Sequence, residues 1–570
     1  MLKKIYIWND LFLIKKNYNS KLIDKKILEI KKKLGNSISF INNKTFNNFK
    51  KNINKLDNIV VIGTRPNLFT TKIKYNINSK RIINKDGFAI DCKIDIDDEV
   101  YKMKKINIVE DIIVSGTTIS KILELLQKKN KIQEINIYFF IGYETTINDL
   151  KKHYKNINIY CFNILKETPK TESTCIFLSD LLYEKLGKIT YIEHVRNKNI
   201  FGNKTEYFLS KIEELKDFLK LKVGIVTITL GINYGNRLQN YALQETLNKI
   251  GVNSQTFENI YQEKKIINKI KRYFTLKKKE KQFALKLKRF DEFNKEYINL
   301  KGTIKSNYVS KNINKKFDYF ICGSDQIWNP YYVGNRGTNF LTFAQKPKTI
   351  SYAASFGASD ILDDRKLEFK KYLEHINCLS CREEQGIKII KDLTGRDAQL
   401  VLDPTLLLSK SEWKKISKKP KYIPQKKYLV TYFLGNLNED YRQRIKDIAK
   451  KNNLEVFNIM DISDIDKFST NPSEFIYLIQ NAELICTDSF HGNVFSIIFN
   501  KPYIIFERND NITNMNSRFV SLNNILKLPN RNYKSIKKEE IFNMDYTLIN
   551  QNIEKEKEKS IEYLKKSLKL

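Results

Sequence analysis

Residues 222–243 read KVGIVTITLGINYGNRLQNYAL, and this stretch indicates the fold class of the region around it. It starts as a short apolar run typical of a buried strand, continues as a glycine-bearing loop and leads directly into a helical pattern. Such a junction points backbone N–H groups and the positive end of a helix toward an anion above the sheet. Gly231 and Gly235 allow tight turns, and Arg237 adds a guanidinium that can contact a carboxylate or phosphate in two places.

The same alternation of apolar runs and amphipathic, lysine-rich segments extends along the whole chain, which predicts an α/β fold around parallel sheets. With 570 residues the chain is too long for one hydrophobic core. A charged helix before residue 218 and a proline-containing segment near residue 415 predict three domains, at 1–218, 219–415 and 416–570. The expected strands are 58–62, 106–109, 135–141, 157–164, 223–228, 317–321, 349–353, 376–381, 399–402 and 428–434.

The chain carries a formal net charge of +37, which can indicate a nucleic acid or an anionic membrane as partner. The lysine excess is spread over the whole chain together with abundant asparagine and isoleucine. We therefore interpret it as a solvated surface and expect no nucleic-acid partner. The very basic segment 262–300 has apolar residues at helical spacing, which fits a packed amphipathic helix or, alternatively, a helix lying on a membrane surface.

Cysteine spacing and hydropathy bear on the compartment. Seven cysteines without paired spacing favour a reducing environment, and the close pair Cys378 and Cys381 has no second pair to complete a zinc site. No run of about 18 uncharged apolar residues occurs, and Asp10 interrupts the N-terminal segment. We expect a soluble, cytoplasmic protein without a bound metal, and leave open a peripheral contact with the inner membrane surface.

Further motifs follow the opening stretch in a fixed order. They are GSDQIWN (323–329), SCREE (380–384), LDPT (402–405) and TDSFHG (487–492). Together with NYGNRLQNYAL they resemble the polysaccharide pyruvyl transferase family over residues 222–530. The resemblance implies two Rossmann-like lobes in a GT-B-like arrangement, with the active site between them. It also implies transfer of the pyruvyl group of phosphoenolpyruvate, as a ketal, onto a sugar of a surface polysaccharide or its precursor, without a cofactor.

Ketal formation needs an acid/base group, cations for the donor and polar groups that orient the acceptor. His491 lies between a predicted strand and a predicted helix, and imidazole suits proton transfer near neutral pH. The family resemblance implies a catalytic role for the same histidine. We add Asp488 and Asp325 as catalytic candidates, although Asp325 could simply cap the following turn.

Arginine is scarce in this chain relative to lysine, so an arginine beside a motif indicates a need for bidentate geometry. Arg382 could instead form a structural ion pair with Glu383 or Glu384. The substrate-binding candidates are Gly235, Asn236, Arg237, Gln326, Arg382, Ser489, Gly492 and Arg518.

The first block contains a different pattern, INIVEDIIVSGTTISKILELL at 106–126. Amides and hydroxyls of its Ser-Gly-Thr-Thr turn suit a phosphate monoester, and adjacent carboxylates suit a ribose diol. The pattern resembles the phosphoribosyl-pyrophosphate motif of type I phosphoribosyltransferases, over residues 25–165, and IVVIGTRPNL at 59–68 falls where that family places its pyrophosphate loop. Magnesium is expected only with that ligand, and a threonine-capped structural helix is the alternative. The candidate residues are Glu110, Asp111, Ser115, Gly116, Thr117 and Thr118.

Two other functions fit the same architecture. One is a GT-B-like glycosyltransferase that uses a nucleotide sugar, and the other is a non-catalytic phosphosugar-binding protein. His491 with its flanking Asp and Gly disfavours the binding protein. The expected partners are phosphoenolpyruvate and a sugar or lipid-linked oligosaccharide, while the acceptor's identity and the oligomeric state do not follow from the sequence.

Overall fold

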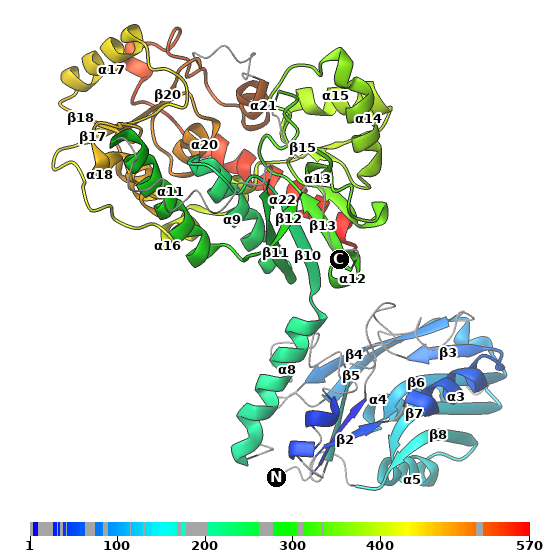
Figure 1. Cartoon of the computed structure of the whole chain (residues 1–570). Helices are drawn as coiled ribbons and strands as arrows, with labels where there is room; N and C mark the ends of the chain where they lie inside the picture. Colours follow the sequence, from blue (N-terminus) through cyan, green and yellow to red (C-terminus); the bar gives the residue numbers. More distant parts are fainter. Residues whose placement is uncertain are drawn as a thin grey trace. The chain divides into compact units, whose positions relative to one another are not determined.

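The chain folds into two units, Met1–Leu219 (the first unit) and Lys220–Leu570 (the second unit), both drawn in Figure 1. Parallel strands alternating with helices form most of each unit, so the predicted mixed α/β class is confirmed. The computed structural model describes residues 4–8, 27–30, 32–34, 38–41, 43–62, 75–83, 89–113, 116–128, 132–167, 173–177, 202–260, 278–305, 312–331, 336–508 and 517–570.

The first unit is built on a six-stranded sheet with the strand order β5-β4-β3-β6-β7-β8. All neighbouring strands are parallel except β4 and β5. Apolar residues of α3 and α4 are buried in two separate clusters. Val61 of β3 belongs to the cluster of α3, and the adjacent Val60 belongs to the cluster of α4. Because successive strand residues point to opposite faces, the two helices cover opposite faces of the sheet. The elements are β3 (Ile59–Ile62), β4 (Tyr75–Ile83), β5 (Ala89–Ile96), β6 (Lys105–Ile113), β7 (Glu134–Tyr143), β8 (Ile157–Leu165), α3 (Asn43–Ile53), α4 (Thr117–Gln127), α5 (Glu144–His153) and α8 (Thr205–Leu219). A smaller parallel sheet has the order β2-β1-β9, with β1 at Lys4–Trp8, β2 at Ile38–Ile41 and β9 at Ser173–Phe177.

A row of asparagines crosses three strands of the larger sheet. Asn107, Asn136 and Asn158 are in register on β6, β7 and β8. The Nδ2 atom of Asn136 donates to Oδ1 of Asn107 at 3.1 Å, and Nδ2 of Asn158 donates to Oδ1 of Asn136 at 2.8 Å. Because a buried amide is tolerated only when it is hydrogen-bonded, this row explains why polar residues interrupt otherwise apolar strands.

The second unit begins with a five-stranded parallel sheet in the order β12-β11-β10-β13-β14. Residues 222–243 lie in β10, the loop after it and α9, as predicted. The sequence pattern missed β11 and β12, because polar residues and Gly302 break their apolar periodicity. Buried Thr256 on β11 is satisfied by donating to Oδ1 of Asn240 at 2.8 Å. The elements are β10 (Leu221–Val226), α9 (Tyr234–Lys249), β11 (Val252–Ile260), β12 (Leu300–Lys305), β13 (Tyr319–Cys322), β14 (Thr349–Ser351), and the short parallel pair β15 (Ser380–Cys381) and β16 (Gln399–Leu400).

A second parallel sheet, with the order β18-β17-β19-β20, follows in the same unit. One hydrophobic core extends over both sheets and includes Val223, Trp413, Phe475 and Leu564. The elements are β17 (Tyr428–Tyr432), β18 (Glu455–Asn458), β19 (Leu484–Thr487), β20 (Tyr503–Ile505), η7 (Pro404–Leu407), α15 (Glu384–Thr394), α18 (Ile465–Phe468), α19 (Pro472–Asn481), α20 (Phe490–Ile498), α21 (Ser517–Leu526) and α22 (Thr547–Leu568).

The C-terminal helix α22 contacts the first sheet of this unit, as Figure 1 shows. The hydroxyl of Tyr563 donates to the carbonyl oxygen of Ser351 at 2.9 Å, and the N–H of Leu402 donates to Oγ of Ser560 at 3.0 Å. The second contact fixes the peptide directly before Asp403. The end of the chain therefore supports the first sheet.

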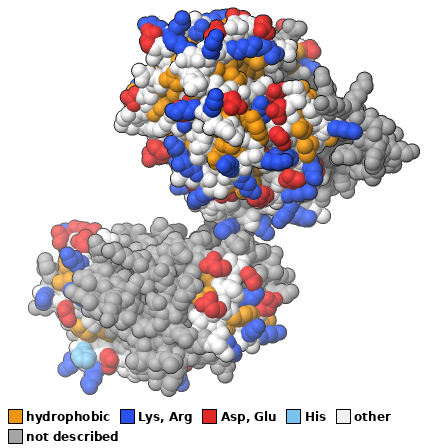
Figure 2. Space-filling model, turned by 90° about the vertical axis from the view of Figure 1, so that its left-hand side faces the viewer, with side chains coloured by type: hydrophobic (Ala, Val, Ile, Leu, Met, Phe, Trp, Pro, Cys, Tyr) orange, Lys and Arg blue, Asp and Glu red, His pale blue; other side chains and the backbone are white. Residues whose placement is uncertain are grey.

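Lysine and arginine side chains are distributed over the face drawn in Figure 2 among aspartates and glutamates. Within the basic segment 262–300, residues 278–300 are described and include helix α11 (Lys278–Tyr297). Residues 262–277 lie outside the described residues. Phe290 and Phe293 of α11 are buried in the core, as expected of a packed amphipathic helix. No helix among the described residues combines the length and the apolar character needed to cross a membrane.

Lys286 on α11 departs from the usual rule that lysine is exposed. Its side chain is fully buried, and its Nζ atom donates to the hydroxyl of Tyr234 at 3.0 Å. Nζ also lies 4.5 Å from the centre of the Phe468 ring. Burial lowers the pKa of Lys286 to about 7. Nearby, Arg289 and Glu474 form an ion pair at 2.7 Å that also joins α11 to α19.

This burial predicts a pH-dependent stability. In the unfolded chain a lysine stays protonated up to a pKa of about 10.4. Between pH 7 and that value the unfolded state therefore binds more protons, and the free energy of unfolding should rise with pH by up to about 1.4 kcal/mol per unit. The increment should disappear in Lys286→Met, when denaturant unfolding is followed by tryptophan fluorescence from pH 7 to pH 9.5.

Lys288→Met is the matched control, because Lys288 is exposed on the same helix. It should leave the pH dependence of the wild type unchanged. Parallel pH curves for the wild type and Lys286→Met would contradict the prediction.

Candidate functional site

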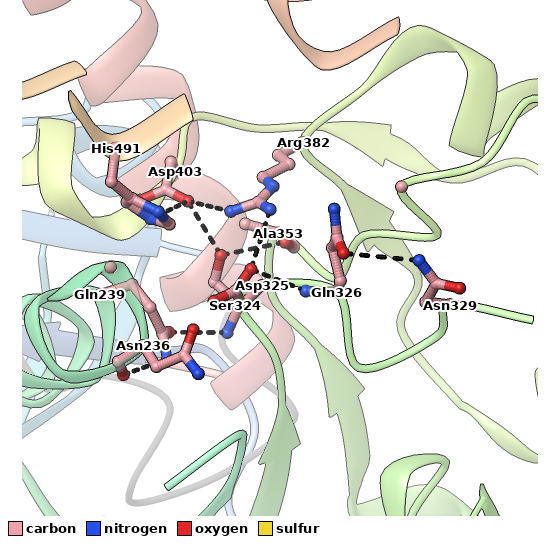
Figure 3. Close-up of polar contacts among 12 residues, drawn as sticks. Asn236, Gln239, Ser324, Asp325, Gln326, Asn329, Ala353, Arg382, Asp403 and His491 are labelled. Carbon is pink, nitrogen blue, oxygen red and sulfur yellow. Dashed lines mark hydrogen bonds and ion pairs between the residues drawn. The ribbon is translucent and has the colours of Figure 1, made fainter. Parts of the chain in front are cut away.

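Polar side chains gather where parallel strands of the second unit end. In open α/β sheets this edge is where ligands bind. Each residue of the group follows a strand directly or after a short loop: Gly235 follows β10, Ser324 and Asp325 follow β13, Arg382 follows β15, Asp403 follows β16 and His491 follows β19. Figure 3 shows most of these side chains pointing toward one another.

The loop before α9 is held by its own side chains. Asn233 caps the helix by accepting from the N–H of Gly235 at 2.9 Å. The two terminal nitrogens of Arg237 donate to the carbonyl oxygens of Leu230 and Gly231 at 3.0 and 2.9 Å. Asn236 donates to the same Leu230 carbonyl at 3.5 Å. Arg237, which we expected to face an anion, is buried and fastens this loop, and burial lowers its pKa to about 10.

His491 lies in the first turn of α20, which begins at Phe490, so it belongs to the helix and does not lie before it. Ser489 caps this helix by accepting from the N–H of Gly492 at 3.4 Å. The imidazole packs against Gly235, where a Cβ atom would lie only 1.9 Å from Nδ1 of the ring. Only glycine fits there, so the first turns of α9 and α20 meet at this contact.

The Nε2 atom of His491 is buried and makes no hydrogen bond with the described residues. It lies 3.6 Å from Oδ2 of Asp403, close enough for electrostatic attraction but too far for a hydrogen bond. The side chain of His491 is 4% exposed and that of Asp403 is fully buried. The Nε2 atom therefore lies beside a buried carboxylate without being hydrogen-bonded to it.

Asp403 caps η7 and connects the rest of the group. Its Oδ1 atom accepts from the backbone N–H and the hydroxyl of Thr405 at 3.0 and 2.7 Å. Its Oδ2 atom accepts from Arg382 at 2.6 Å and from the hydroxyl of Ser324 at 3.1 Å. Burial alone would raise the pKa of Asp403, but the charges of His491 and Arg382 and these hydrogen bonds hold it well below its usual range.

Arg382 has three buried carboxylates around it. Besides Asp403, it donates from NH2 to Oδ1 of Asp325 at 3.2 Å, and its Nε atom lies 3.8 Å from Oε2 of Glu383. Burial acts to lower the pKa of Arg382, yet the three carboxylates outweigh it and raise the pKa. Of the two structural ion pairs that we considered for Arg382, the one with Glu383 exists at 3.8 Å, but the shorter contacts are with Asp403 and Asp325, which we did not predict. Glu384 instead accepts from Asn524 on α21 at 3.1 Å.

The loop after β13 contributes the remaining members. Asp325 adopts φ of 70°, a conformation that is costly for a residue with a side chain and that recurs at functional sites. Its Oδ2 atom is buried without a hydrogen bond among the described residues. Gln326 packs on Gly357 and accepts from Asn329 at 3.4 Å. The N–H of Ser324 donates to Oε1 of Gln239 at 3.1 Å, and this bond connects the loop to helix α9.

Asp488 has a structural contact that we did not expect, and Arg518 lies beside the ring of Phe490. Asp488 accepts from the N–H groups of Leu434 and Gly435 at 2.7 and 2.8 Å, so it fastens the loop after β17 to the end of β19. Its pKa is raised, mainly by burial. Arg518 is buried on α21, and its guanidinium carbon lies 5.7 Å from the centre of the Phe490 ring.

Sequence reasoning missed Asp403, Ser324 and Gln239 as members of the site. The motif LDPT contains Asp403, but its place in the site depends on partners far away in the chain. An aspartate before proline at a strand end was the available signal, since a carboxylate there caps the next turn. Among the described residues, no group of three or more His, Cys, Asp or Glu side chains is arranged to hold a metal ion.

The candidate residues of the first unit lie at the end of β6 and the start of α4. Glu110 is buried, and Asp111 accepts from the N–H of Ile112 at 2.7 Å. Gly116 has φ of 75° and precedes Thr117 and Thr118, the first residues of α4. Since β3 and β6 are parallel neighbours, the carboxyl ends of both strands lie at the same edge of the sheet. Ser115 and residues 63–68 of the expected pyrophosphate loop lie outside the described residues.

Comparison with protein families matches residues 233–511 to the family described as polysaccharide pyruvyl transferase. The matched range lies within the second unit and contains every candidate residue there except Arg518. The match supports a transferase that modifies polysaccharides. None of the curated proteins compared with the chain matches it.

Several solved structures share elements with the chain. The AQ2163 protein from Aquifex aeolicus is 14% identical over 19% of this chain, with a TM-score of 0.16, and the chain spans about half (54%) of its length. A putative UDP-N-acetylglucosamine 2-epimerase from Listeria monocytogenes is 11% identical, with 50% of this chain and 79% of that chain covered and a TM-score of 0.33. The glycosyltransferase SnogD from Streptomyces nogalater is 9% identical, with coverages of 61% and 98% and a TM-score of 0.30. These TM-scores are too low to bear on function.

The contact between Gly235 and His491 yields a test of the site's geometry. In Gly235→Ala the new methyl group would overlap the imidazole, so the ring must move and the free energy of unfolding should fall by about 1–3 kcal/mol. The double variant Gly235→Ala/His491→Ala removes the overlap and should regain stability relative to Gly235→Ala alone. Denaturant unfolding of the full chain measures both, and a Gly235→Ala chain as stable as the wild type would contradict the described packing.

Proposed function

We propose that the second unit transfers the pyruvyl group of phosphoenolpyruvate onto a sugar as a ketal. The observation that carries the proposal is a buried histidine, His491, with an unbonded Nε2 atom 3.6 Å from the carboxylate of Asp403. The histidine lies in a segment that matches the polysaccharide pyruvyl transferase family. Such a group can deliver and recover a proton at a site that excludes bulk water.

The reaction requires three proton movements, one onto the donor carbon and one from each of two sugar hydroxyls. Protonation converts the methylene carbon of phosphoenolpyruvate into a methyl group and leaves an oxocarbenium-like centre at the neighbouring carbon. One sugar hydroxyl adds there and loses its proton. A second hydroxyl then displaces phosphate and gives its proton to the leaving phosphate, so that phosphoenolpyruvate and a diol become a ketal and inorganic phosphate. We assign the first proton transfer to His491, with the ionised Asp403 stabilising the imidazolium.

The remaining candidates are assigned by their chemistry. The buried amides of Asn236 and Gln326 suit sugar hydroxyls, which both donate and accept. Arg518 is assigned to the anionic groups of the donor. Arg237 would contact the donor only by exchanging one of its two loop carbonyls. We propose a GT-B-like arrangement for the second unit, and its two parallel sheets are compatible with that arrangement. We also propose a cytoplasmic location for the protein.

Replacement of the histidine tests this assignment. His491→Ala should lower phosphate release from phosphoenolpyruvate, measured across a panel of sugar acceptors, by about two orders of magnitude or more, because a positioned acid/base is removed. His153→Ala is the control, since His153 is exposed on α5 in the first unit. Turnover close to the wild type in His491→Ala would contradict the assignment.

The same assay separates the alternatives. Transfer from a nucleotide sugar, with no phosphate released from phosphoenolpyruvate, would favour a glycosyltransferase. Saturable binding of a phosphosugar without turnover of either donor would favour a binding protein.

For the first unit we propose a phosphoribose site at the end of β6. Two acids, Glu110 and Asp111, precede the left-handed Gly116, and α4 begins at the next residue. The carboxylates suit the ribose hydroxyls, and the first turn of the helix with Thr117 and Thr118 suits a 5′-phosphate. The proposed ligand is phosphoribosyl pyrophosphate or a related phosphoribose.

Thermal unfolding of the full chain tests this site. A ligand that binds only the folded unit stabilises it by about 4 kcal/mol when its concentration is a thousandfold above the dissociation constant. Magnesium phosphoribosyl pyrophosphate should raise the melting temperature of the wild type and of Asp149→Asn, an exposed control on α5, but not of Asp111→Asn. No shift in the wild type at millimolar ligand would contradict the proposal.

A further inference from the structure

The hydrogen-bonding groups of Arg382 face the protein on every side. Its side chain is 1% exposed, NH1 lies 2.6 Å from Asp403 and NH2 lies 3.2 Å from Asp325. Nε lies 3.8 Å from Glu383 and forms no hydrogen bond among the described residues. Each terminal nitrogen keeps one further N–H, but the side chain is almost completely enclosed, and an anion that reached it would lie beside the two carboxylates already paired with the same guanidinium. Bringing a third anion to a buried cation that is already paired twice is unfavourable.

Arg382 also contacts the helix that contains the histidine. Its guanidinium carbon lies 4.6 Å from the centre of the Phe490 ring. The rings of Phe490 and His491 are 5.4 Å apart and nearly perpendicular. Arg382 therefore adjoins His491 along two routes, through Phe490 in the same helical turn and through Asp403.

The way Asp403 is shared determines what His491 can do. Its Oδ2 atom already accepts from Arg382 and from Ser324, and this leaves His491 at 3.6 Å without a hydrogen bond. Without Arg382, that oxygen would be free to bond the imidazole directly and to draw its proton away from the substrate. Figure 3 shows Asp403 lying between Arg382 and His491.

The charge of the group points the same way. Asp325, Asp403 and Glu383 place three buried carboxylates beside one guanidinium. A donor with a carboxylate and a phosphate would find no excess positive charge at Arg382. The cation that contacts the donor must lie elsewhere in the site.

We infer that Arg382 is a positioning residue, which holds Asp403 and Phe490 so that the Nε2 atom of His491 stays directed at substrate, and that it does not bind the donor. This inference rests on the proposed function of the second unit. It changes the role first expected for Arg382 from an anion ligand to a support for the histidine.

Steady-state kinetics of the full chain distinguish the two roles. Arg382→Met should lower kcat by about 100-fold, because the histidine loses its support, while KM for phosphoenolpyruvate stays within about threefold of the wild type. Asp403→Asn should have the same signature. In the double variant the loss should not exceed that of the worse single variant, because the two residues act as one unit. Arg396→Met, which removes an arginine bonded to the carbonyls of Leu373 and Asn377, is the control with unchanged kcat and KM.

Other outcomes would overturn the inference. A rise of about 100-fold in KM for phosphoenolpyruvate with kcat retained would make Arg382 a donor ligand, and additive losses in the double variant would show that Arg382 does not act through Asp403. If Arg382→Met does not fold, the single variants Arg382→Lys and Asp403→Asn are measured in its place. A loss in kcat then supports the positioning role, and a rise in KM for phosphoenolpyruvate contradicts it. An inactive wild-type chain overturns the proposed function and this inference together, whereas an active wild type with a raised KM in the variants overturns the inference alone.

Discussion

The guanidinium of Arg382, enclosed by three carboxylates, is the interaction on which the polar group of the second unit depends. Buried charges are tolerated only when they are paired and hydrogen-bonded, so each of these side chains constrains the position of the others. Asp403 caps η7, Asp325 belongs to the loop after β13, Glu383 accepts from the N–H groups of Phe356 and Gly357, and Arg382 follows β15. One cation thus joins four segments of the first sheet and its loops, and through Phe490 it also contacts the second sheet's helix α20.

The position of His491 also depends on a close steric contact with Gly235. His491 reaches the group only because position 235 has no side chain, and the first turns of α9 and α20 therefore meet. A core shared by both sheets and the return of α22 to the first sheet hold these turns in place. Parallel strands bring their carboxyl ends to one edge, so residues from five strands meet without any of them being close in sequence.

The first unit follows the same architectural rule with different chemistry. Its asparagine row satisfies the buried amides of Asn107 on β6 and Asn136 on β7, with the exposed Asn158 on β8 as a further partner, while the acids and threonines of the proposed phosphoribose site lie farther along, at the end of β6 and the start of α4. The family match does not extend into this unit. The two proposed sites draw on separate segments, so each can be tested without the other.

The sequence by itself determined the α/β class, the strand, loop and helix at 222–243, and the place of His491 at a junction of a strand and a helix. These features follow from the spacing of apolar residues, from helix-capping residues and from glycines, all of which act over a few neighbouring residues. Only the tertiary structure decided that Arg382 pairs with Asp403 and Asp325, that Arg237 binds loop carbonyls, that Asp488 fastens a loop and that Lys286 is buried among aromatic rings. Partners such as Arg382 and Asp325 are 57 residues apart. Strands β11 and β12 were missed because polar residues and Gly302 interrupt their apolar pattern, and the partner that accepts from buried Thr256 on β11, Asn240 of α9, is supplied only by packing.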